Sequence, residues 1–347
     1  PPNQSLCNGI VTNAIAFNGP VSGTTFTWTN TAPLIGLQAS GSGNIPAFTA
    51  TGNGFSTSVA TITVRPTALG CVGPTKTFTI TINPIPNVIQ PPDQALCNGA
   101  STNLVTFTGG MNNIPSYNWT NNNPSIGLAA TGTGNIASFK ALNTTSAPVT
   151  ATITVTPSTS FCSGLPQSFS IIVQPTPLVV ASNNTFVCIG NSSQLTVTGA
   201  SQYTWSPATW LSCTNCPNPV STPTDTIKYV VQGTSAFGCI AYDTVSLNVM
   251  KPFQMLITPN DTLCLSKSAN LAASGAYRDV WSPPAGLNRV DIANPRATPG
   301  TTTLYIVVGY DEHNCFTDTS SVRITVGPWP TVNIGPDLTL STGSTVQ

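Results

Sequence analysis

The residues of this sequence best suited to chemistry are its ten cysteines, and two of them stand close together. Cys213 and Cys216 form a Cys-x-x-Cys motif, a spacing that zinc ribbons and thiol oxidoreductases share. A structural zinc site needs four ligands, but there is no second such motif and only one histidine, His313. A thioredoxin-type motif begins a helix, and the sequence predicts no helix here. We therefore predict a local disulfide in a proline-flanked loop; a free, exchangeable pair and a metal site are the alternatives.

Acid–base catalysis has almost no candidate residues, because the chain has one histidine and one glutamate. His313 lies in the stretch GYDEHNCF, which predicts a solvated hairpin turn. A weak cation site formed by Asp311, Glu312 and Asp318 is the alternative, since hard cations prefer clustered oxygens. No pair of carboxylates recurs at a spacing suited to glycoside hydrolysis. We predict no catalytic residues, no cofactor and no enzyme activity.

Composition limits the partners and the compartment. Charged residues make up 6% of the chain and cancel to a net charge of zero, which leaves no footprint for nucleic acid or an anionic membrane. No apolar run of 18 residues predicts insertion into a membrane. An even number of cysteines is typical of oxidising, extracellular surroundings. No signal peptide is visible, and we expect the N-terminus to be processed or cropped.

Internal repeats organise the sequence. NQSLCNG (3–9) recurs as DQALCNG (93–99), and Cys71 recurs 91 residues later as Cys162. A second period of 76 residues relates Cys188 to Cys264 and continues without a shift in register. The repeats predict four domains and the opening strands of a fifth, incomplete one, with boundaries at residues 1–87, 88–177, 178–250, 251–328 and 329–347. We call the first four repeats 1 to 4.

Each repeat is predicted to be a β-sandwich. Runs such as TFTITI (77–82) and SVRITV (321–326) alternate polar and apolar residues, and turn residues separate them every 8 to 12 positions. One tryptophan recurs in each repeat and is predicted to lie in the core on the third strand: Trp28, Trp119, Trp205 and Trp281. We predict an all-β fold, a tandem array of such sandwiches. Trp329, at a seam, is predicted to pack one domain on the next.

The repeats also suggest how the other eight cysteines pair. Pairing within repeats predicts one disulfide in each: Cys7–Cys71, Cys97–Cys162, Cys188–Cys239 and Cys264–Cys315. Closing such loops contributes on the order of 4 kcal/mol each in the chain-entropy model. In repeat 4 the positions aligned with Cys213 and Cys216 are Arg289 and Ile292, so one of the two related loops has no thiols.

Residues 203–249, from YTWSPATWLSCTNCPNP onward, closely resemble the PKD-like and immunoglobulin-like repeats in giant surface proteins of Bacteroidota. GLQASGSGNIPAF and GLAATGTGNIASF in repeats 1 and 2 look like the longer PKD-like repeats of those proteins. The resemblance implies type IX secretion and a role in adhesion, gliding or extracellular filaments. No sorting domain is visible, and WTN and WSP replace the usual PKD signature after the tryptophan. We therefore do not infer for this chain the calcium or carbohydrate roles that are tied to the usual PKD signature.

Three Asp-Thr-apolar triplets resemble the O-glycosylation acceptor of Bacteroidota. The candidate acceptors are Thr226, Thr244 and Thr262. Glycans there would help to explain how so uncharged a surface stays soluble, and we treat the modification as a hypothesis.

Taken together, these patterns predict a non-catalytic stalk or filament segment of a large extracellular surface protein. The alternatives are an adhesin module that binds glycans or surfaces, and a spacer in a secreted hydrolase. We expect self-association, or contact with neighbouring domains of the same long chain, as the main partnership. The strands of the incomplete domain at 329–347 either continue into further chain or pair with a neighbouring subunit by strand addition.

Overall fold

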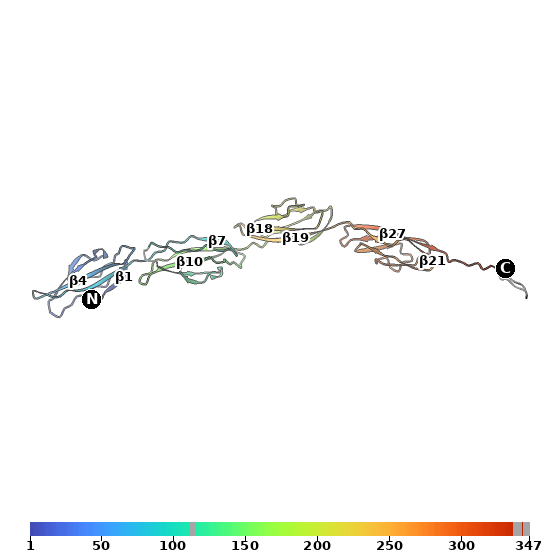
Figure 1. Ribbon diagram of the computed structural model, residues 1–347. Coiled ribbons are helices and arrows are strands. Elements are labelled where there is room, and N and C mark those ends of the chain that lie inside the picture. Colours follow the sequence, from blue (N-terminus) through green and yellow to red (C-terminus); the bar gives the residue numbers. More distant parts are fainter. Residues whose placement is uncertain (111–114, 336–341, 343–347) are drawn as a thin grey trace. The chain divides into compact units, whose positions relative to one another are not determined.

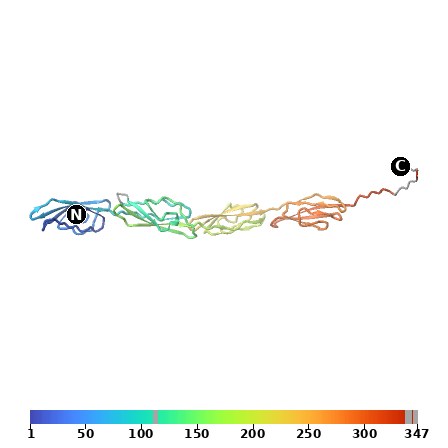
Figure 2. The ribbon, with the colours of Figure 1, turned by 90° about the horizontal axis from the view of Figure 1, so that it is seen from below.

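The computed structural model describes residues 1–110, 115–335 and residue 342. Each repeat forms a separate group of strands, with its own colour in Figures 1 and 2. The described residues contain no α-helix, only the short 3-10 turns η1 (Pro33–Ile35) and η2 (Pro124–Ile126). This confirms the predicted all-β, tandem-sandwich fold. Among the described residues no helix is long and apolar enough to cross a membrane.

Repeat 1 is built on a sheet with the strand order β1-β6-β4-β2-β3, and β5 pairs with β4. The strands are β1 (Gln4–Cys7), β2 (Thr25–Asn30), β3 (Ser40–Ser42), β4 (Ser58–Ala68), β5 (Cys71–Val72) and β6 (Lys76–Asn83). β1 runs parallel to β6, whereas the other pairings are antiparallel. Irregular segments joined by isolated bridges, including Ile15 with Ile45, bury their apolar side chains in the same core as the sheet.

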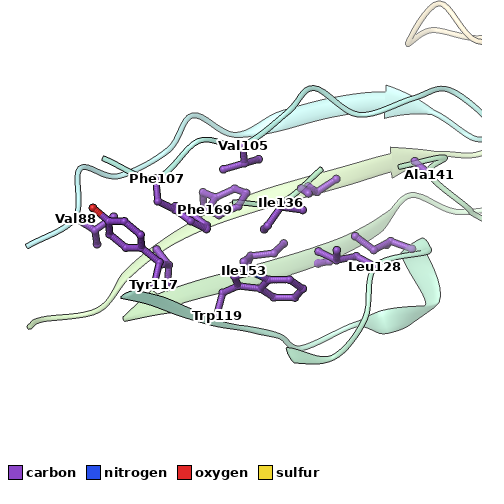
Figure 3. Close-up of a cluster of buried hydrophobic side chains, with 14 of the residues drawn as sticks. Val88, Val105, Phe107, Tyr117, Trp119, Leu128, Ile136, Ala141, Ile153 and Phe169 are labelled. Atoms are coloured by element: carbon purple, nitrogen blue, oxygen red, sulfur yellow. The ribbon is translucent and has the colours of Figure 1, made fainter. Parts of the chain in front are cut away.

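Repeat 2 repeats this topology with the order β7-β11-β10-β8-β9. Its strands are β7 (Gln94–Cys97), β8 (Ser116–Asn121), β9 (Thr131–Thr133), β10 (Val149–Ser158) and β11 (Gln167–Gln174). β7 is again parallel to β11. Figure 3 shows the core, in which side chains from the sheet, such as Ile153 and Phe169, meet Val105 and Ile136.

Repeats 3 and 4 each combine a four-stranded sheet with two small two-stranded sheets. In repeat 3 the large sheet has the order β13-β19-β18-β16, and in repeat 4 the order β21-β27-β26-β24. The small sheets pair β12 with β15, β14 with β17, β20 with β23 and β22 with β25. The strands of repeat 3 are β12 (Val180–Ala181), β13 (Thr185–Cys188), β14 (Ser193–Gln194), β15 (Val197–Thr198), β16 (Gln202–Ser206), β17 (Val220–Ser221), β18 (Ile227–Thr234) and β19 (Ile240–Met250). Those of repeat 4 are β20 (Leu256–Ile257), β21 (Asp261–Cys264), β22 (Ala269–Asn270), β23 (Ala273–Ser274), β24 (Arg278–Ser282), β25 (Arg296–Ala297), β26 (Thr303–Tyr310) and β27 (Thr317–Gly327).

The four tryptophans predicted for the core are buried: Trp28, Trp119, Trp205 and Trp281. In repeat 2 the Trp119 ring covers Gly132 of the neighbouring strand β9, where a Cβ atom would lie closer than 3.0 Å to the indole. Repeat 1 has the same arrangement, with Gly41 opposite Trp28. Large aromatic side chains thus fill the sandwich because glycine leaves room beside them.

By its internal contacts the chain divides into two compact units. The first contains residues 1–178 and 234–241, and the second contains residues 179–233 and 242–347. The five domain boundaries drawn from the repeats remain predictions. Residues 328–335 form no strand, and the rest of the predicted opening strands, at 336–341 and 343–347, lies outside the described residues.

Candidate functional site at the repeat junctions

The structure contradicts the four disulfides predicted within repeats. Cys7–Cys71, Cys97–Cys162, Cys188–Cys239 and Cys264–Cys315 are not formed. Instead, the early cysteine of one repeat is bonded to the late cysteine of the next: Cys7–Cys162, Cys97–Cys239 and Cys188–Cys315, with Cα–Cα distances of 5.8, 5.6 and 5.4 Å. The disulfides therefore connect successive repeats.

The direction of the strands explains why the disulfides within repeats do not form. In repeat 1, β1 is parallel to β6, and Cys7 stands opposite Asn83, the last residue of β6. Cys71 comes before Lys76, the first residue of β6. The two cysteines of the repeat are thus separated by the length of this strand, roughly 23 Å at 3.3 Å per residue. A disulfide needs Cα atoms within about 7 Å, so the bond within the repeat is geometrically excluded.

The linker between repeats 1 and 2 starts next to Cys7, the early cysteine of repeat 1, and one of its side chains packs into the core of repeat 2. Ile89 N donates a hydrogen bond to Thr108 O (2.8 Å), and Val88 is buried in the core of repeat 2. A Cβ atom on Gly109 or Gly164 would collide with the backbone of the linker. Glycine at these two positions therefore lets the linker backbone lie directly on repeat 2.

The junction of repeats 3 and 4 is closed by similar contacts. The rings of Phe186 and His313 stack with centroids 3.8 Å apart, next to the disulfide Cys188–Cys315. The backbone N–H of Met255 donates to Asp318 Oδ2 (2.8 Å). His313 is half-buried, so the prediction of a solvated turn was wrong for this side chain, because it packs on the preceding repeat.

Two of the three carboxylates considered as a weak cation site, Asp311 and Asp318, accept hydrogen bonds from backbone amides. Asp311 accepts hydrogen bonds from the N–H groups of His313, Cys315 and Phe316. Burial by itself would raise the pKa of Asp311, but these three amides and the nearby imidazole stabilise the carboxylate and lower it. Asp318 accepts the hydrogen bond from the backbone N–H of Met255, and Glu312 is exposed. Within the part of the chain that the structure describes, no group of three or more His, Cys, Asp or Glu side chains could hold a metal ion.

The Cys-x-x-Cys motif forms a local disulfide, with Cα atoms 6.1 Å apart. Its role is visible in the core, because the indole Nε1–H of Trp205 donates to Cys216 O (2.9 Å). The loop that the disulfide closes therefore holds the hydrogen-bond partner of the buried tryptophan.

The related loop of repeat 4 reaches the same geometry without thiols. There Trp281 Nε1–H donates to Ile292 O (3.0 Å). Arg289, at the position of Cys213, makes a two-pronged contact with Asp291, at 2.9 and 2.8 Å. This contact lowers the pKa of Asp291 and raises that of Arg289. An ion pair inside this loop is thus present where the loop of repeat 3 has its disulfide.

Two cysteines are unpaired and exposed in the structure: Cys71, the late cysteine of repeat 1, and Cys264, the early cysteine of repeat 4. In contrast, the late cysteines that are bonded at the first two junctions, Cys162 and Cys239, are buried. Sequence reasoning missed both free thiols because it paired every cysteine inside its own repeat.

The three candidate glycosylation sites have exposed side chains and a common local geometry. The Asp that precedes each threonine accepts a hydrogen bond from that threonine's backbone N–H, at 2.9 Å for Thr226, 2.8 Å for Thr244 and 2.7 Å for Thr262. These positions are therefore accessible, and the modification itself stays a prediction.

Searches of protein families and of curated proteins find no match to this chain. Among solved structures, it is similar to immunoglobulin domains 1–4 of Sidekick-1, with 11% identity, 94% of this chain and 97% of that chain covered, and a TM-score of 0.30. For the insect immune protein hemolin the identity is 11%, the coverage 94% and 98%, and the TM-score 0.29. For Drosophila N-cadherin EC1-4 the values are 10%, 94%, 99% and 0.29. At these TM-scores the similarities carry no argument about function, which has to come from the junctions themselves.

Proposed function

We propose that this chain is a non-catalytic structural segment of an extracellular protein, and that its repeats form an extended stalk or filament. The observation that carries the proposal is the set of three disulfides that join successive repeats. A disulfide gives each junction a second covalent connection beside the linker, so the joint can bend less than a linker alone would allow.

The setting follows from the same bonds. Eight of ten cysteines are in disulfides, which persist in oxidising, extracellular surroundings. Attachment to a cell surface, type IX secretion and a Bacteroidota source are part of the proposal and rest on the resemblance of the repeats. So do glycans on Thr226, Thr244 and Thr262, which intact mass spectrometry would detect as mass beyond that of the polypeptide.

The low charge of the surface also supports this proposal. With 6% charged residues and no net charge, neighbouring molecules can approach without strong repulsion. We propose that the faces of the repeats serve contacts with other domains or copies, and that each predicted domain boundary separates one such structural unit from the next.

Small-angle X-ray scattering tests this function. An extended chain has a radius of gyration well above the roughly 20 Å expected for a compact globule of 347 residues. Opening the three junction disulfides by Cys→Ser substitution, with the Cys213–Cys216 bond left in place, should broaden the distribution of dimensions. A compact particle, or dimensions that do not respond to the substitutions, would contradict the proposal.

A further inference from the structure

The Cys213–Cys216 disulfide differs from the other disulfides because it joins two residues of one loop. The three junction disulfides join residues that are 127 to 155 positions apart in the sequence. The related loop of repeat 4 has no disulfide, yet the bond from its buried Trp281 has a length of 3.0 Å, against 2.9 Å for Trp205. A loop of this kind therefore reaches its geometry without a sulfur–sulfur bond.

Backbone hydrogen bonds hold the loop on the rest of repeat 3. They join Trp205 N–H to Thr214 O (2.8 Å), Val197 N–H to Pro217 O (3.0 Å) and Leu195 N–H to Pro219 O (2.9 Å). Repeat 4 has the same three bonds, from Trp281, Ala273 and Leu271 to Val290, Ala293 and Pro295. These bonds use no sulfur atom, so opening the disulfide leaves its two thiols close together in the docked loop. The bond can then form again.

The sulfur atoms of this loop are more accessible than those of the first two junctions. Cys213 and Cys216 are both half-buried, whereas Cys162 and Cys239 are only 3% and 2% exposed. A thiol that attacks the bonding partner of Cys162 or Cys239 has to expel a thiolate into a buried site. The cost of placing a negative charge there slows the exchange.

The third junction is protected by charge. Both cysteines of the Cys188–Cys315 bond are half-buried, but the carboxylate of Asp311 accepts a hydrogen bond from the N–H of Cys315 (3.1 Å). The stacked rings of Phe186 and His313 lie beside the same bond. A negative charge next to Cys315 repels an attacking thiolate and disfavours a leaving one.

The loop of repeat 3 has neither obstacle. Residues 203–224 contain no charged side chain, so no carboxylate in this segment repels a thiolate. Ser212 Oγ accepts the N–H of Val220 (2.9 Å), and its hydroxyl donates to Cys213 Sγ (3.9 Å). This donor stabilises negative charge on Cys213 when the bond breaks. The better leaving group is therefore Cys213, and the sulfur open to attack is that of Cys216.

We propose that Cys213–Cys216 is a thiol–disulfide exchange site for small extracellular thiols of the class of cysteine and glutathione. This activity goes beyond the proposed structural function, because the junction disulfides stay closed while it operates.

The exchange needs no reactant besides the thiol. A thiolate attacks Cys216 Sγ, the bond between the two cysteines breaks, and its electron pair goes to Cys213, which takes up a proton. A second thiolate attacks the mixed disulfide on Cys216 and releases a small disulfide and the Cys216 thiol. Two small thiols are thus oxidised to one disulfide, one protein disulfide is reduced to two thiols, and two protons pass to the protein. The small disulfide reverses the sequence.

Time-resolved alkylation of the wild-type chain tests the proposal. Cys71 and Cys264 are first blocked with N-ethylmaleimide, glutathione is added, and samples are alkylated with iodoacetamide and mapped by mass spectrometry. Cys213 and Cys216 should become alkylated about tenfold faster than any junction cysteine, with glutathione found on Cys216 in early samples. Junction disulfides that open as fast as Cys213–Cys216 would overturn the inference.

A second readout tests whether the loop keeps its place. Near-ultraviolet circular dichroism of the selectively reduced chain should keep the tryptophan signals, and oxidised glutathione should restore the bond. Loss of these signals on reduction would overturn the inference, because the thiols would no longer be held together.

The positioning role of Ser212 is tested by substitution. Ser212→Ala should slow opening of the disulfide about threefold, and Ser212→Thr should restore the rate because it retains the hydroxyl. The matched control is Asn288→Ala in repeat 4, since Asn288 accepts the backbone N–H of Arg296 in the same way, at 2.7 Å. It should leave the rate unchanged. Equal effects of Ser212→Ala and Asn288→Ala would exclude the role of the hydroxyl.

Discussion

Repeats 1 and 2 share a topology but differ at one end of their cores. Phe107 and Tyr117 of repeat 2 are buried, with 5% and 6% exposed, whereas the aligned Phe17 and Phe26 of repeat 1 are half-buried. The difference is the linker, because Val88 covers the rings of repeat 2 and no described residue takes its place in repeat 1. A sandwich of this kind is completed by the segment that precedes it.

The largest expected effect comes from the aromatic rings themselves. Phe107→Ala should destabilise repeat 2 by about 4 kcal/mol, because it leaves a large cavity in a closed core. Phe17→Ala should cost about half as much, since that ring is only half-buried and lines an open groove of repeat 1. Denaturant unfolding of a chain that contains repeats 1 and 2 measures both, and equal losses would remove the contrast between the two repeats.

A charge at the linker position should make repeat 2 resemble repeat 1. Val88→Asp is expected to destabilise repeat 2 by about 3 kcal/mol, because it loses a buried valine and forces a carboxylate toward the core. Val332→Asp, in the segment that follows repeat 4, serves as the control and should leave the unfolding curve unchanged, because Val332 is exposed. If Val88→Asp is also silent, the linker does not complete the core.

The loops of repeats 3 and 4 extend the comparison to a second pair of related segments. Replacing both Cys213 and Cys216 by serine should lower the stability of repeat 3 by about 2 kcal/mol, the chain-entropy value for so short a loop. Asp291→Asn in repeat 4 should have a smaller effect, since the Arg289–Asp291 pair is exposed and screened by salt. Calorimetry at two salt concentrations separates the two losses of stability, because only the ion pair depends on salt. A salt-dependent loss in repeat 3 would contradict the role given to its disulfide.

The smallest effect concerns pH. Asp279 is buried, its Oδ1 atom has no hydrogen-bond partner, and burial raises its pKa above the ordinary value. The folded state therefore holds this proton more tightly than the unfolded state, and stability falls as pH rises from the unfolded pKa, about 4, through the raised one. Asp279→Asn should raise the melting temperature of repeat 4 at pH 7 and should change it little below pH 4. A gain that is the same at both pH values would exclude the protonation mechanism.

The sequence predicted the features that follow from periodicity. Alternating runs predicted the strands, the spacing of Trp28 and its three relatives predicted the core, and the absence of partner ligands predicted the Cys213–Cys216 bond that the structure contains. These inferences depend only on local patterns and on the repeat register.

The pairing of the other cysteines could not be read in the same way. Identical cysteine positions in every repeat fit bonds within repeats and bonds between repeats equally well. The deciding fact is that β1 runs parallel to β6, which places Cys7 and Cys71 at opposite ends of a strand, and an alternating pattern carries no information about strand direction. A usable signal was present in the linkers, because an apolar residue recurs five positions after the last strand of the repeat, at Val88, Val179 and Met255, and all three side chains are buried in the structure.

Peptide mapping without reduction tests the central claim most directly. The account predicts three linked peptide pairs, containing Cys7 with Cys162, Cys97 with Cys239, and Cys188 with Cys315. Recovery of Cys7 with Cys71, or of Cys97 with Cys162, would contradict it, because each repeat would then be closed by its own bond and the junctions would be held by the linkers alone.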